Sequence, residues 1–327
     1  MFPSKRSSDP GSNPGGAILS FKMQEKVKLN KFKPEDKEIF DKAYSSLEFP
    51  LAEHSFAWIY IWDYCYNDIQ WAKINGNLCL FLNFLGNRYI WGPALPGINL
   101  PDTLRKCFEL CEQYNKEHKI KGKPSVKYIP EELKEKYSNI HGYKLVHQNQ
   151  DYIYKREDII ELKGDKYKSK RNLRNYFIKN YKYKVGEYEK DKHMKECVEV
   201  LDKWEKQKLN VVNGEHHESL DDEYDANLKV LELAEMFGLK GVVVYVDDKI
   251  QGYTFGEQTN KNMCTDFFEK TNLDIKGLSV FIYGELLKIF EGNLVNAGED
   301  WGVDYLKAIK LSYHPIMIRK SYTLEKA

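Results

Sequence analysis

The sequence has no long hydrophobic run. Across its 327 residues, no apolar stretch approaches the length of about 20 residues that a membrane-spanning helix requires. The richest stretch, residues 58–66, is too short and is interrupted by Asp63. The first residues also lack the apolar core of a secretion signal. We therefore expect a cytoplasmic protein that has no transmembrane segment.

Closely spaced cysteine pairs are also missing. The six cysteines form no CxxC motif, so the two pairs that hold a four-thiolate zinc ion are not present. Cys107 and Cys111 lie four residues apart on a predicted helix and have no second pair nearby. His216 and His217 are adjacent, point in different directions along the chain and have no well-spaced third ligand. The sequence predicts reduced thiols and no metal site.

Net charge is nearly absent, but the charges are unevenly distributed. Fifty Lys and Arg residues against 49 Asp and Glu residues give a formal charge of +1, which by itself indicates no polyanionic partner. Residues 163–184 nevertheless hold nine cationic side chains and one acid, Asp165. Residues 215–225 hold six acids and no base. Each segment requires its own interpretation.

The basic segment carries interleaved aromatic residues, a combination that suits phosphate backbones and stacked bases. Leu173 and Phe177 are four residues apart on a predicted helix and face the core together. This arrangement predicts that Lys170, Arg171 and Arg174 are exposed side by side. The alternative is a solvated helix whose cations pair with the acidic stretch and contact no ligand.

Alternating strand and helix patterns predict an α+β protein built from two similar halves. Residues 69–74 and 78–85 flank an Asn-Gly turn, which is typical of a β-hairpin. Residues 241–246 and 250–256 repeat the pattern around a short polar turn. Strands are also expected at residues 143–147 and 151–154. We predict a disordered tail over residues 1–22, rich in Ser, Pro and Gly, and two domains at residues 23–150 and 151–327.

A dense aromatic segment, HSFAWIYIWDYCYND, occupies residues 54–68. One interpretation is a buried helix end that anchors the fold through its aromatic rings. The other is a wall against which a substrate stacks. The sequence leaves both interpretations open.

The stretch from residue 294 to residue 322, LVNAGEDWGVDYLKAIKLSYHPIMIRKSY, combines adjacent carboxylates with a helical pattern. Glu299 and Asp300 come just before the predicted helix, whose N-terminal partial charge favours ionised carboxylates. The helix ends before His314 and Pro315, because a residue that precedes proline is disfavoured in the α region. An ordinary capped helix with a solvated basic face would account for the same pattern.

This stretch resembles the closing motif of the DUF2156 family, the C-terminal domain of phosphatidylglycerol lysyltransferases. The matching residues are Asn296, Glu299, Asp300, Gly302, Leu306, Lys310, Ser312, Tyr313 and Pro315. Ala297, Gly298 and Trp301 depart from the motif, and Lys307 replaces an arginine. A second segment of the family is matched by Gly164, Lys166, Tyr167, Lys170, Arg171 and Asn172. The resemblance covers roughly residues 30–325.

The resemblance implies two tandem GNAT-like domains, each a mixed, mostly antiparallel sheet flanked by helices. It implies transfer of an aminoacyl group from aminoacyl-tRNA to an amine or hydroxyl of a lipid headgroup, peptide or small molecule. An acyl-CoA donor is less favoured, because such enzymes hold pyrophosphate in a glycine-rich loop and residues 269–279 offer only Gly277. An acyl-CoA-dependent N-acyltransferase is therefore one alternative. An inactive binding module is the other, because Ala297 and Gly298 stand where the family carries Arg and Glu.

Acyl transfer needs a base for the nucleophile and hydrogen-bond donors for the oxyanion. The candidate catalytic carboxylates are Asp300, Glu299 and Glu269. The candidate substrate-binding residues are Lys270, Asn296, Lys307, Lys310, Tyr313 and Lys320. The candidate contacts to the acceptor end of tRNA are Lys166, Lys170, Arg171 and Arg174.

Overall fold

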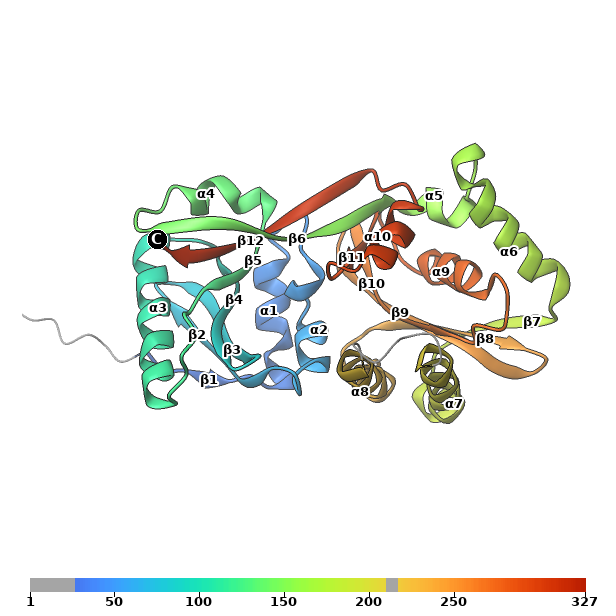
Figure 1. Cartoon of the computed structure of the whole chain (residues 1–327), viewed down its shortest axis with the longest axis horizontal. Helices are drawn as coiled ribbons and strands as arrows, with labels where there is room; N and C mark the ends of the chain where they lie inside the picture. The colour runs from blue at the N-terminus through green and yellow to red at the C-terminus, as the bar shows by residue number, and fades with distance from the viewer. Residues whose placement is uncertain (1–26, 210–216) are drawn as a thin grey trace, which may run out of the picture.

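The computed structural model describes residues 27–209 and 217–327 of the chain. These residues form one 12-stranded mixed sheet with helices on both sides (Figure 1), in the order β1-β2-β3-β4-β5-β12-β6-β11-β10-β9-β8-β7. The predicted disordered tail over residues 1–22 lies outside the described residues, as do His216 and the side chains of the acidic stretch up to residue 220.

The N-terminal half contains the left-hand end of the sheet in Figure 1 and the helices around it. Its strands are β1 (Asn30–Lys31), β2 (Asn67–Ile74), β3 (Asn77–Phe84), β4 (Asn87–Leu95) and β5 (Val126–Pro130). Its α-helices are α1 (Lys37–Tyr44), α2 (Phe56–Ile61), α3 (Leu100–Glu117) and α4 (Lys134–Ser138). Short 3-10 helices are η1 (Pro34–Asp36), η2 (Ala52–His54) and η3 (Glu131–Leu133).

The C-terminal half follows the strand β6 (Tyr143–Lys155) and contains most of the candidate site residues. Its strands are β7 (Tyr183–Glu187), β8 (Lys240–Val246), β9 (Lys249–Asn260), β10 (Met263–Thr271), β11 (Leu294–Glu299) and β12 (Met317–Lys326). Its helices are α5 (Arg156–Glu161), η4 (Asp165–Tyr167), α6 (Lys168–Asn180), α7 (Lys190–Leu209), α8 (His217–Leu233), α9 (Leu278–Lys288) and α10 (Asp304–Leu311).

Both predicted hairpins are confirmed. Strands β2 and β3 pair from Ile74 and Asn77 outward, and the turn between them places Asn75 at φ 50° in the left-handed region. Strands β8 and β9 pair antiparallel in the same way around Asp247 and Asp248, which also have positive φ. Asn and Asp tolerate this conformation better than most residues, which is why they dominate such turns.

The expectation of two strands at residues 143–147 and 151–154 is wrong, because β6 is one continuous strand. Its polar middle, Gln148 to Gln150, suggested a break in the sequence. In the structure this middle pairs with β12, where Lys320 lies opposite Gln150. The predicted domain boundary between residues 150 and 151 therefore falls inside β6. Strand β12, which follows all the other strands in sequence, lies between β5 and β6 in the sheet.

Helices cover the sheet of the C-terminal half in two layers. Figure 1 shows α7 and α8 on one face and α5, α6 and α9 on the other. On the first face, the rings of α2 and Phe268 pack with Leu201 and Val230 in one large core that joins the halves. On the second face, Phe177 and Phe281 belong to a separate core. None of the described helices is both long and apolar enough to cross a bilayer.

Strands β10 and β11 separate after a short parallel pairing. The pairs are Met263–Leu294, Cys264–Val295 and Thr265–Asn296, although β10 continues to Thr271 and β11 to Glu299. Both strands carry register irregularities toward their outer neighbours at this point. Such irregularities redirect side chains and are frequent beside functional sites. Beyond Thr265 and Asn296 the two strands are no longer paired with each other.

Candidate active site

The side chain of Lys310 enters the separation between β10 and β11. Its Nζ donates a hydrogen bond to the carbonyl oxygen of Ala297 in β11. Burial lowers the pKa of Lys310, and nearby negative charge acts in the opposite direction. That negative charge comes, in decreasing order of effect, from Asp266, Asp151, Asp300 and Glu299. One buried ammonium group thus lies among four carboxylates.

Glu299 ends β11 and is the carboxylate most suited to accept a proton near neutral pH. Burial raises the pKa of Glu299 to about 8, with further upward contributions from Asp151 and Asp300 and an opposing one from Lys310. Asn149 of β6 donates a hydrogen bond from Nδ2 to Glu299 Oε2. A base is most effective when its pKa lies near the working pH.

Asp300 does not cap the following helix, which corrects the expectation from the sequence. The helix α10 begins at Asp304, and a turn with Trp301 at φ 52° and Gly302 at φ 71° precedes it. This turn directs Asp300 into the protein, where only 5% of the residue is exposed. Tyr152 donates a hydrogen bond to Oδ2 of Asp300 at 2.5 Å, and the backbone N–H of Gly302 donates to Oδ1 at 2.9 Å.

Asp151 was not singled out by the sequence, yet it joins the site to the N-terminal half. Asn296 donates from Nδ2 to Asp151 Oδ2 at 2.7 Å, and the backbone N–H of Ala52 donates to the same oxygen at 3.4 Å. Burial raises the pKa of Asp151 to about 6. Asn296 also donates to the carbonyl of Pro50 at 3.2 Å, so this predicted substrate-binding residue is a buried bridge between the halves.

Glu53 is a second residue that sequence reasoning missed. It lies on η2, directly before the aromatic segment, and is only 3% exposed. Burial raises the pKa of Glu53, and the carboxylates of Glu299 and Asp151 raise it further. No other described residue forms an ion pair or a hydrogen bond with its carboxylate. Because Glu53 precedes the family motifs by more than a hundred positions, only the three-dimensional structure reveals its place beside them.

Glu269 and Lys270 point to opposite faces of β10, as neighbouring strand residues do. Lys270 forms an ion pair with Glu223 of α8 at 2.5 Å, and its Nζ lies 4.2 Å from the ring centroid of Trp204 on α7. Burial raises the pKa of Glu269 to about 7, while a hydrogen bond with Ser279 opposes this shift. The structure therefore does not bring Lys270 to the side of the sheet that carries Glu269.

Tyr313 and Lys170 lie with Glu269 on the face covered by α6 and α9. The Nζ of Lys170 lies 4.1 Å from the ring centroid of Tyr313, and Tyr167 donates to the Tyr313 carbonyl at 3.1 Å. Burial lowers the pKa of Lys170, with Glu269 as the opposing charge. The two segments that resemble the family motifs thus meet at this point.

The expectation that Lys170, Arg171 and Arg174 are exposed together is wrong, because all three are partly buried. Arg171 donates to the carbonyls of Leu162 and Gly164 at 2.5 and 2.8 Å. Arg174 donates to the carbonyls of Ile160 and Glu161 at 2.6 and 3.1 Å. The last carbonyls of a helix have no partner within it, and the two guanidinium groups supply partners to the end of α5.

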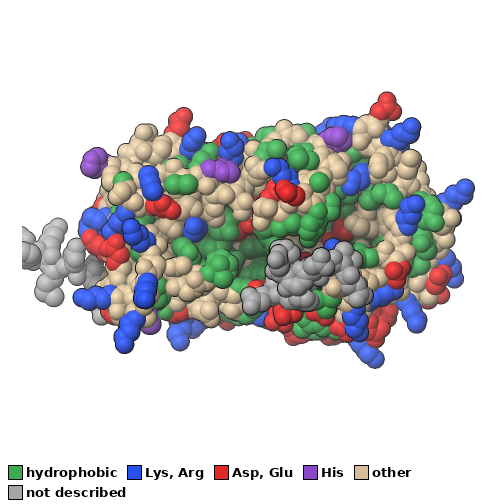
Figure 2. Space-filling view, in the orientation of Figure 1, with side chains coloured by type: hydrophobic (Ala, Val, Ile, Leu, Met, Phe, Trp, Pro, Cys, Tyr) green, Lys and Arg blue, Asp and Glu red, His purple; other side chains and the backbone are tan. Residues whose placement is uncertain are grey.

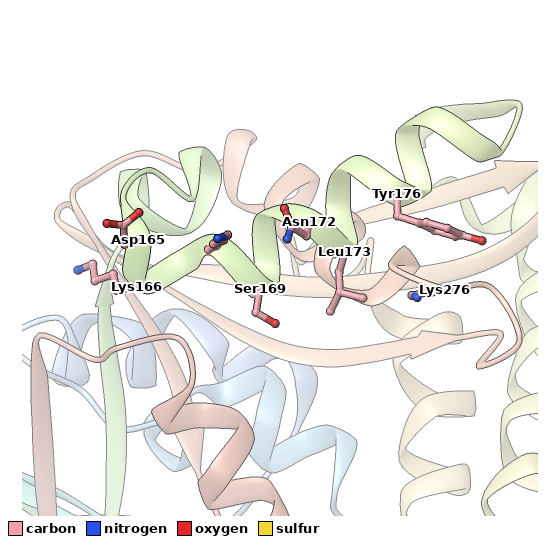
Figure 3. Close-up of a pocket in the computed structure, with 8 residues that line it drawn as sticks. Asp165, Lys166, Ser169, Asn172, Leu173, Tyr176 and Lys276 are labelled. Carbon is pink, nitrogen blue, oxygen red and sulfur yellow. The ribbon is translucent and has the colours of Figure 1, made fainter.

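Two grooves border the site. The larger one, about 650 Å³, runs along α6 beside the loop before α9 (Figure 3) and is lined by Asp165, Lys166, Lys168, Ser169, Asn172, Leu173, Tyr176 and Lys276. The smaller one, about 280 Å³, is lined by His147, Asn149, Gln150, Asp300, Gly302, Asp304 and Lys307.

The remaining predicted cations lie at different distances from the carboxylates. Lys307 reaches the smaller groove together with Asp300. Lys166 lies 3.4 Å from Asp158 in an ion pair at the end of the larger groove. Lys320 is exposed on β12, where its backbone N–H donates to Glu131 at 3.3 Å, and no described contact joins its ammonium to the carboxylates.

Comparison with known proteins gives one similar sequence and several similar structures. An uncharacterised protein of Mycoplasmoides gallisepticum is 28% identical over 186 residues, which cover 55% of this chain and 58% of that protein. The match thus spans less than two thirds of that relative. A Bacteroides thetaiotaomicron protein of unknown function is 24% identical with a TM-score of 0.83, covering 92% of this chain and all of that one.

Two further solved structures share the fold. L-PGS from Bacillus licheniformis has a TM-score of 0.61 at 14% identity, covering 91% of this chain and 93% of that one. FemX has a TM-score of 0.55 at 8% identity, covering 90% and 96%. At these identities the likeness is one of fold, and it confirms the predicted tandem GNAT-like architecture. The model of the phosphatidylglycerol lysyltransferase C-terminal family matches residues 45–325, and the chain belongs to this family.

Proposed function

We propose that this protein transfers an aminoacyl group from aminoacyl-tRNA to an amine or hydroxyl acceptor. The observation that carries the proposal is the Lys310 ammonium group, buried where β10 and β11 separate and surrounded by carboxylates. A positive charge at this position stabilises the negative charge that develops on the carbonyl oxygen when the carbonyl carbon is attacked. Preorganised charge of this kind is often the largest single contribution to acyl-transfer catalysis.

The reaction is an acyl substitution at the ester carbon of the donor. The acceptor nitrogen or oxygen attacks this carbon, and Glu299 takes the proton that the nucleophile loses. Lys310 donates to the oxygen of the tetrahedral intermediate. The ester C–O bond then breaks, the ribose oxygen leaves with a proton, and an amide or a new ester remains. Asp300, held by Tyr152, and Asn296 fix the position of this part of β11.

The donor approaches from the face covered by α6 and α9. Lys168 and Lys276 line the larger groove on this face, and Lys170 lies at the Tyr313 end of α6 near Glu269. Cations in this arrangement suit the phosphates of a tRNA acceptor end. Lys166, Arg171 and Arg174 add positive charge to the same surface, although the two arginines also hold the end of α5.

The packing around Gly277 supports an aminoacyl-tRNA donor over acyl-CoA. Gly277 precedes α9, the position from which acyl-CoA enzymes of this fold bind pyrophosphate through the helix N-terminus. Here a Cβ atom on Gly277 would lie 2.1 Å from the backbone oxygen of Leu173, so α6 presses closely on this end of α9. Because of this contact and the single glycine of the loop, a diphosphate has little access to the N-terminus of α9.

The test is to incubate the protein with tRNA pools charged with labelled amino acids. We expect label to leave the tRNA, and Lys310→Met to slow this step by about 100-fold or more, as loss of an oxyanion donor does. Lys288→Met, which removes an exposed lysine of α9, is the matched control. If no charged tRNA loses label, the protein is a binding module rather than an enzyme. Thermal unfolding of each variant reports whether the fold is intact.

A further inference from the structure

The larger groove presents an exposed aromatic ring next to a cation. Tyr176 of α6 lines this groove together with Lys276 of the loop before α9, and 42% of Tyr176 is exposed. The Nζ of Lys276 lies 4.8 Å from the centroid of the Tyr176 ring, within the range of a cation–π contact. Figure 3 shows both side chains at the same end of the groove. Exposed rings beside cations are the groups on which proteins stack the bases of single-stranded nucleic acids.

The charge of the groove favours a polyanion. Three lysines, Lys166, Lys168 and Lys276, line it together with one acid, Asp165. Figure 2 shows exposed Lys and Arg side chains at the end of the molecule where Figure 1 places α6. Cations attract phosphates of any nucleic acid, paired or unpaired. The exposed ring of Tyr176 adds a contact that charge does not provide, because it offers a surface for a base.

Polar side chains accompany the ring along one face of α6. Ser169, Asn172, Leu173 and Tyr176 are three or four residues apart, so they lie on the same side of the helix. A hydroxyl and an amide can each donate to and accept from the edge of a base. The groove of about 650 Å³ therefore combines a ring for stacking, polar groups for base edges and cations for phosphates.

The packing of α6 holds this surface in place. Phe177, the neighbour of Tyr176, is completely buried, and its ring centroid lies 4.7 Å from that of Phe281 on α9. The loop before α9 is fixed as well, because the backbone of Gly277 packs directly on that of Leu173. Both sides of the groove are thus anchored beside the residues that they expose. A surface that is already ordered loses little freedom when a ligand binds to it.

The ring also lies at a suitable distance from the proposed site of transfer. Lys170, on the same helix, has its Nζ 4.1 Å from the ring centroid of Tyr313 in the candidate site. An α-helix rises about 1.5 Å per residue, so Tyr176 lies about 9 Å farther along α6. A nucleotide close to the ester of the donor can therefore reach the ring. Its base must be unpaired, because the bases of a duplex are stacked within it.

We propose that the larger groove binds a nucleotide of the unpaired 3′ end of tRNA, with its base stacked on Tyr176 and its phosphates beside Lys168 and Lys276. This inference rests on the proposed aminoacyl transfer and identifies the part of the donor that α6 recognises. Tyr176 contacts the donor and takes no part in proton transfer. Because every base has a π face, the contact selects unpaired RNA without selecting a sequence.

The experiment measures binding of the whole chain to a labelled RNA hairpin that ends in an unpaired ACCA strand, by fluorescence anisotropy. The same hairpin with abasic nucleotides in place of ACCA keeps every phosphate and is the reference for charge alone. We expect the parent to bind the ACCA hairpin about tenfold more tightly than the abasic one, the effect of one stacked base.

Variants of α6 assign this preference to the ring. Tyr176→Ala should bind both hairpins equally, and Tyr176→Phe, which keeps a ring, should retain the tenfold preference. Ile178→Ala is the matched control, because Ile178 is on the same helix, is 43% exposed and does not line the groove. It should bind as the parent does. Thermal unfolding of each variant shows whether a loss of binding is local.

Salt dependence separates stacking from charge. Tyr176→Ala should weaken binding of the ACCA hairpin by the same factor at low and high salt, because the ring displaces no counterions. A lower salt slope in Tyr176→Ala would overturn the inference, since the ring would then act only by holding Lys276. Equal binding of the two hairpins by the parent would overturn it as well, because the groove would then recognise a polyanion and no base.

The proposed function and this inference fail in different experiments. The proposed function fails when charged tRNA loses no label, although the ACCA hairpin binds in a manner that depends on the ring of Tyr176. The inference alone fails when charged tRNA loses label, but Tyr176→Ala neither weakens hairpin binding nor raises the KM for charged tRNA.

Discussion

Individual residues at this site are defined mainly by their burial and by the charges beside them. Asp266, Glu269 and Glu299 all have a pKa raised by burial, to about 6, about 7 and about 8 respectively. A carboxylate in this state binds its proton more tightly when folded than when unfolded. Folding is then weakened as the pH rises through the range between the two pKa values. Because these pKa values lie near neutral pH, a small change in pH alters the protonation of the three carboxylates.

The pH dependence of the proposed aminoacyl transfer follows from Glu299. Because the carboxylate must be deprotonated to act as a base, the rate should rise with pH and level off above about pH 8. Glu299→Gln should lower the rate by about 100-fold or more and remove the rise. Initial rates between pH 6 and 9 on charged tRNA, corrected for its spontaneous hydrolysis at each pH, measure this. A parent profile that is flat over this range would assign the base to another group.

Stability should respond to Glu53 in a similar way. Burial raises the pKa of Glu53, so above the ordinary pKa of a glutamate the folded protein must either take up a proton or bury a charge, whereas at lower pH the group is protonated in both states. Glu53→Gln should therefore raise the free energy of unfolding by about 1–3 kcal/mol at pH 8 and change it little at pH 4. Chemical denaturation at the two pH values measures the free energy of unfolding of the parent and of Glu53→Gln. An equal effect at both pH values would show that charge is not the cause.

At the scale of elements, the relation between α5 and α6 revises the role of the basic segment. Arg174 donates to the carbonyls of Ile160 and Glu161 and so supports the C-terminal end of α5. Arg174→Ala should lower the free energy of unfolding by about 1–3 kcal/mol, because two partly buried carbonyls lose their partners. Lys168→Ala, at an exposed position of the same helix, should change it by less than about 0.5 kcal/mol. Denaturant titrations of the parent and of both variants measure the free energies of unfolding that are compared.

tRNA binding is better tested at the groove than at the arginines. Lys168→Ala combined with Lys276→Ala removes two cations of the larger groove. This double variant should weaken tRNA binding and lower the slope of log affinity against log salt by about two. Lys116→Ala with Lys121→Ala, at exposed positions of the N-terminal half, is the control with matched charge. An unchanged slope in the groove variant would place the nucleic acid on another surface.

The sequence predicts those elements that local patterns determine. The hairpins are marked by their turn residues, and the motif stretches by their spacing, so Glu299, Asp300 and Lys310 could be identified in advance. The continuity of β6 could not, because it depends on pairing with β12 from the far end of the chain. The same holds for Glu53 and Asp151, because the burial that raises their pKa values depends on the tertiary structure. Long-range pairing is the information that local patterns lack.

For the molecule as a whole, the continuous sheet makes the two halves depend on each other. Strand β12 pairs with β5 through Tyr322 and Ile129, and with β6 through Met317 and Ile153. A fragment of residues 23–150 therefore lacks the strand that lies between β5 and β6. We expect this fragment to remain unfolded when produced alone and to gain structure when mixed with residues 151–327. Circular dichroism of the fragments, separate and mixed, tests this; a cooperative thermal transition of fragment 23–150 alone would contradict it.

The position of β12 also has a consequence for biosynthesis. The ribosome produces β5 and β6 well before β12, so the edges that β12 will cover stay open while the segment between β6 and β12 is made. Unpaired strand edges are templates for wrong pairing with other chains. We expect the nascent chain to need protection by chaperones during this interval, and the N-terminal half to reach its native state only after β12 has been synthesised.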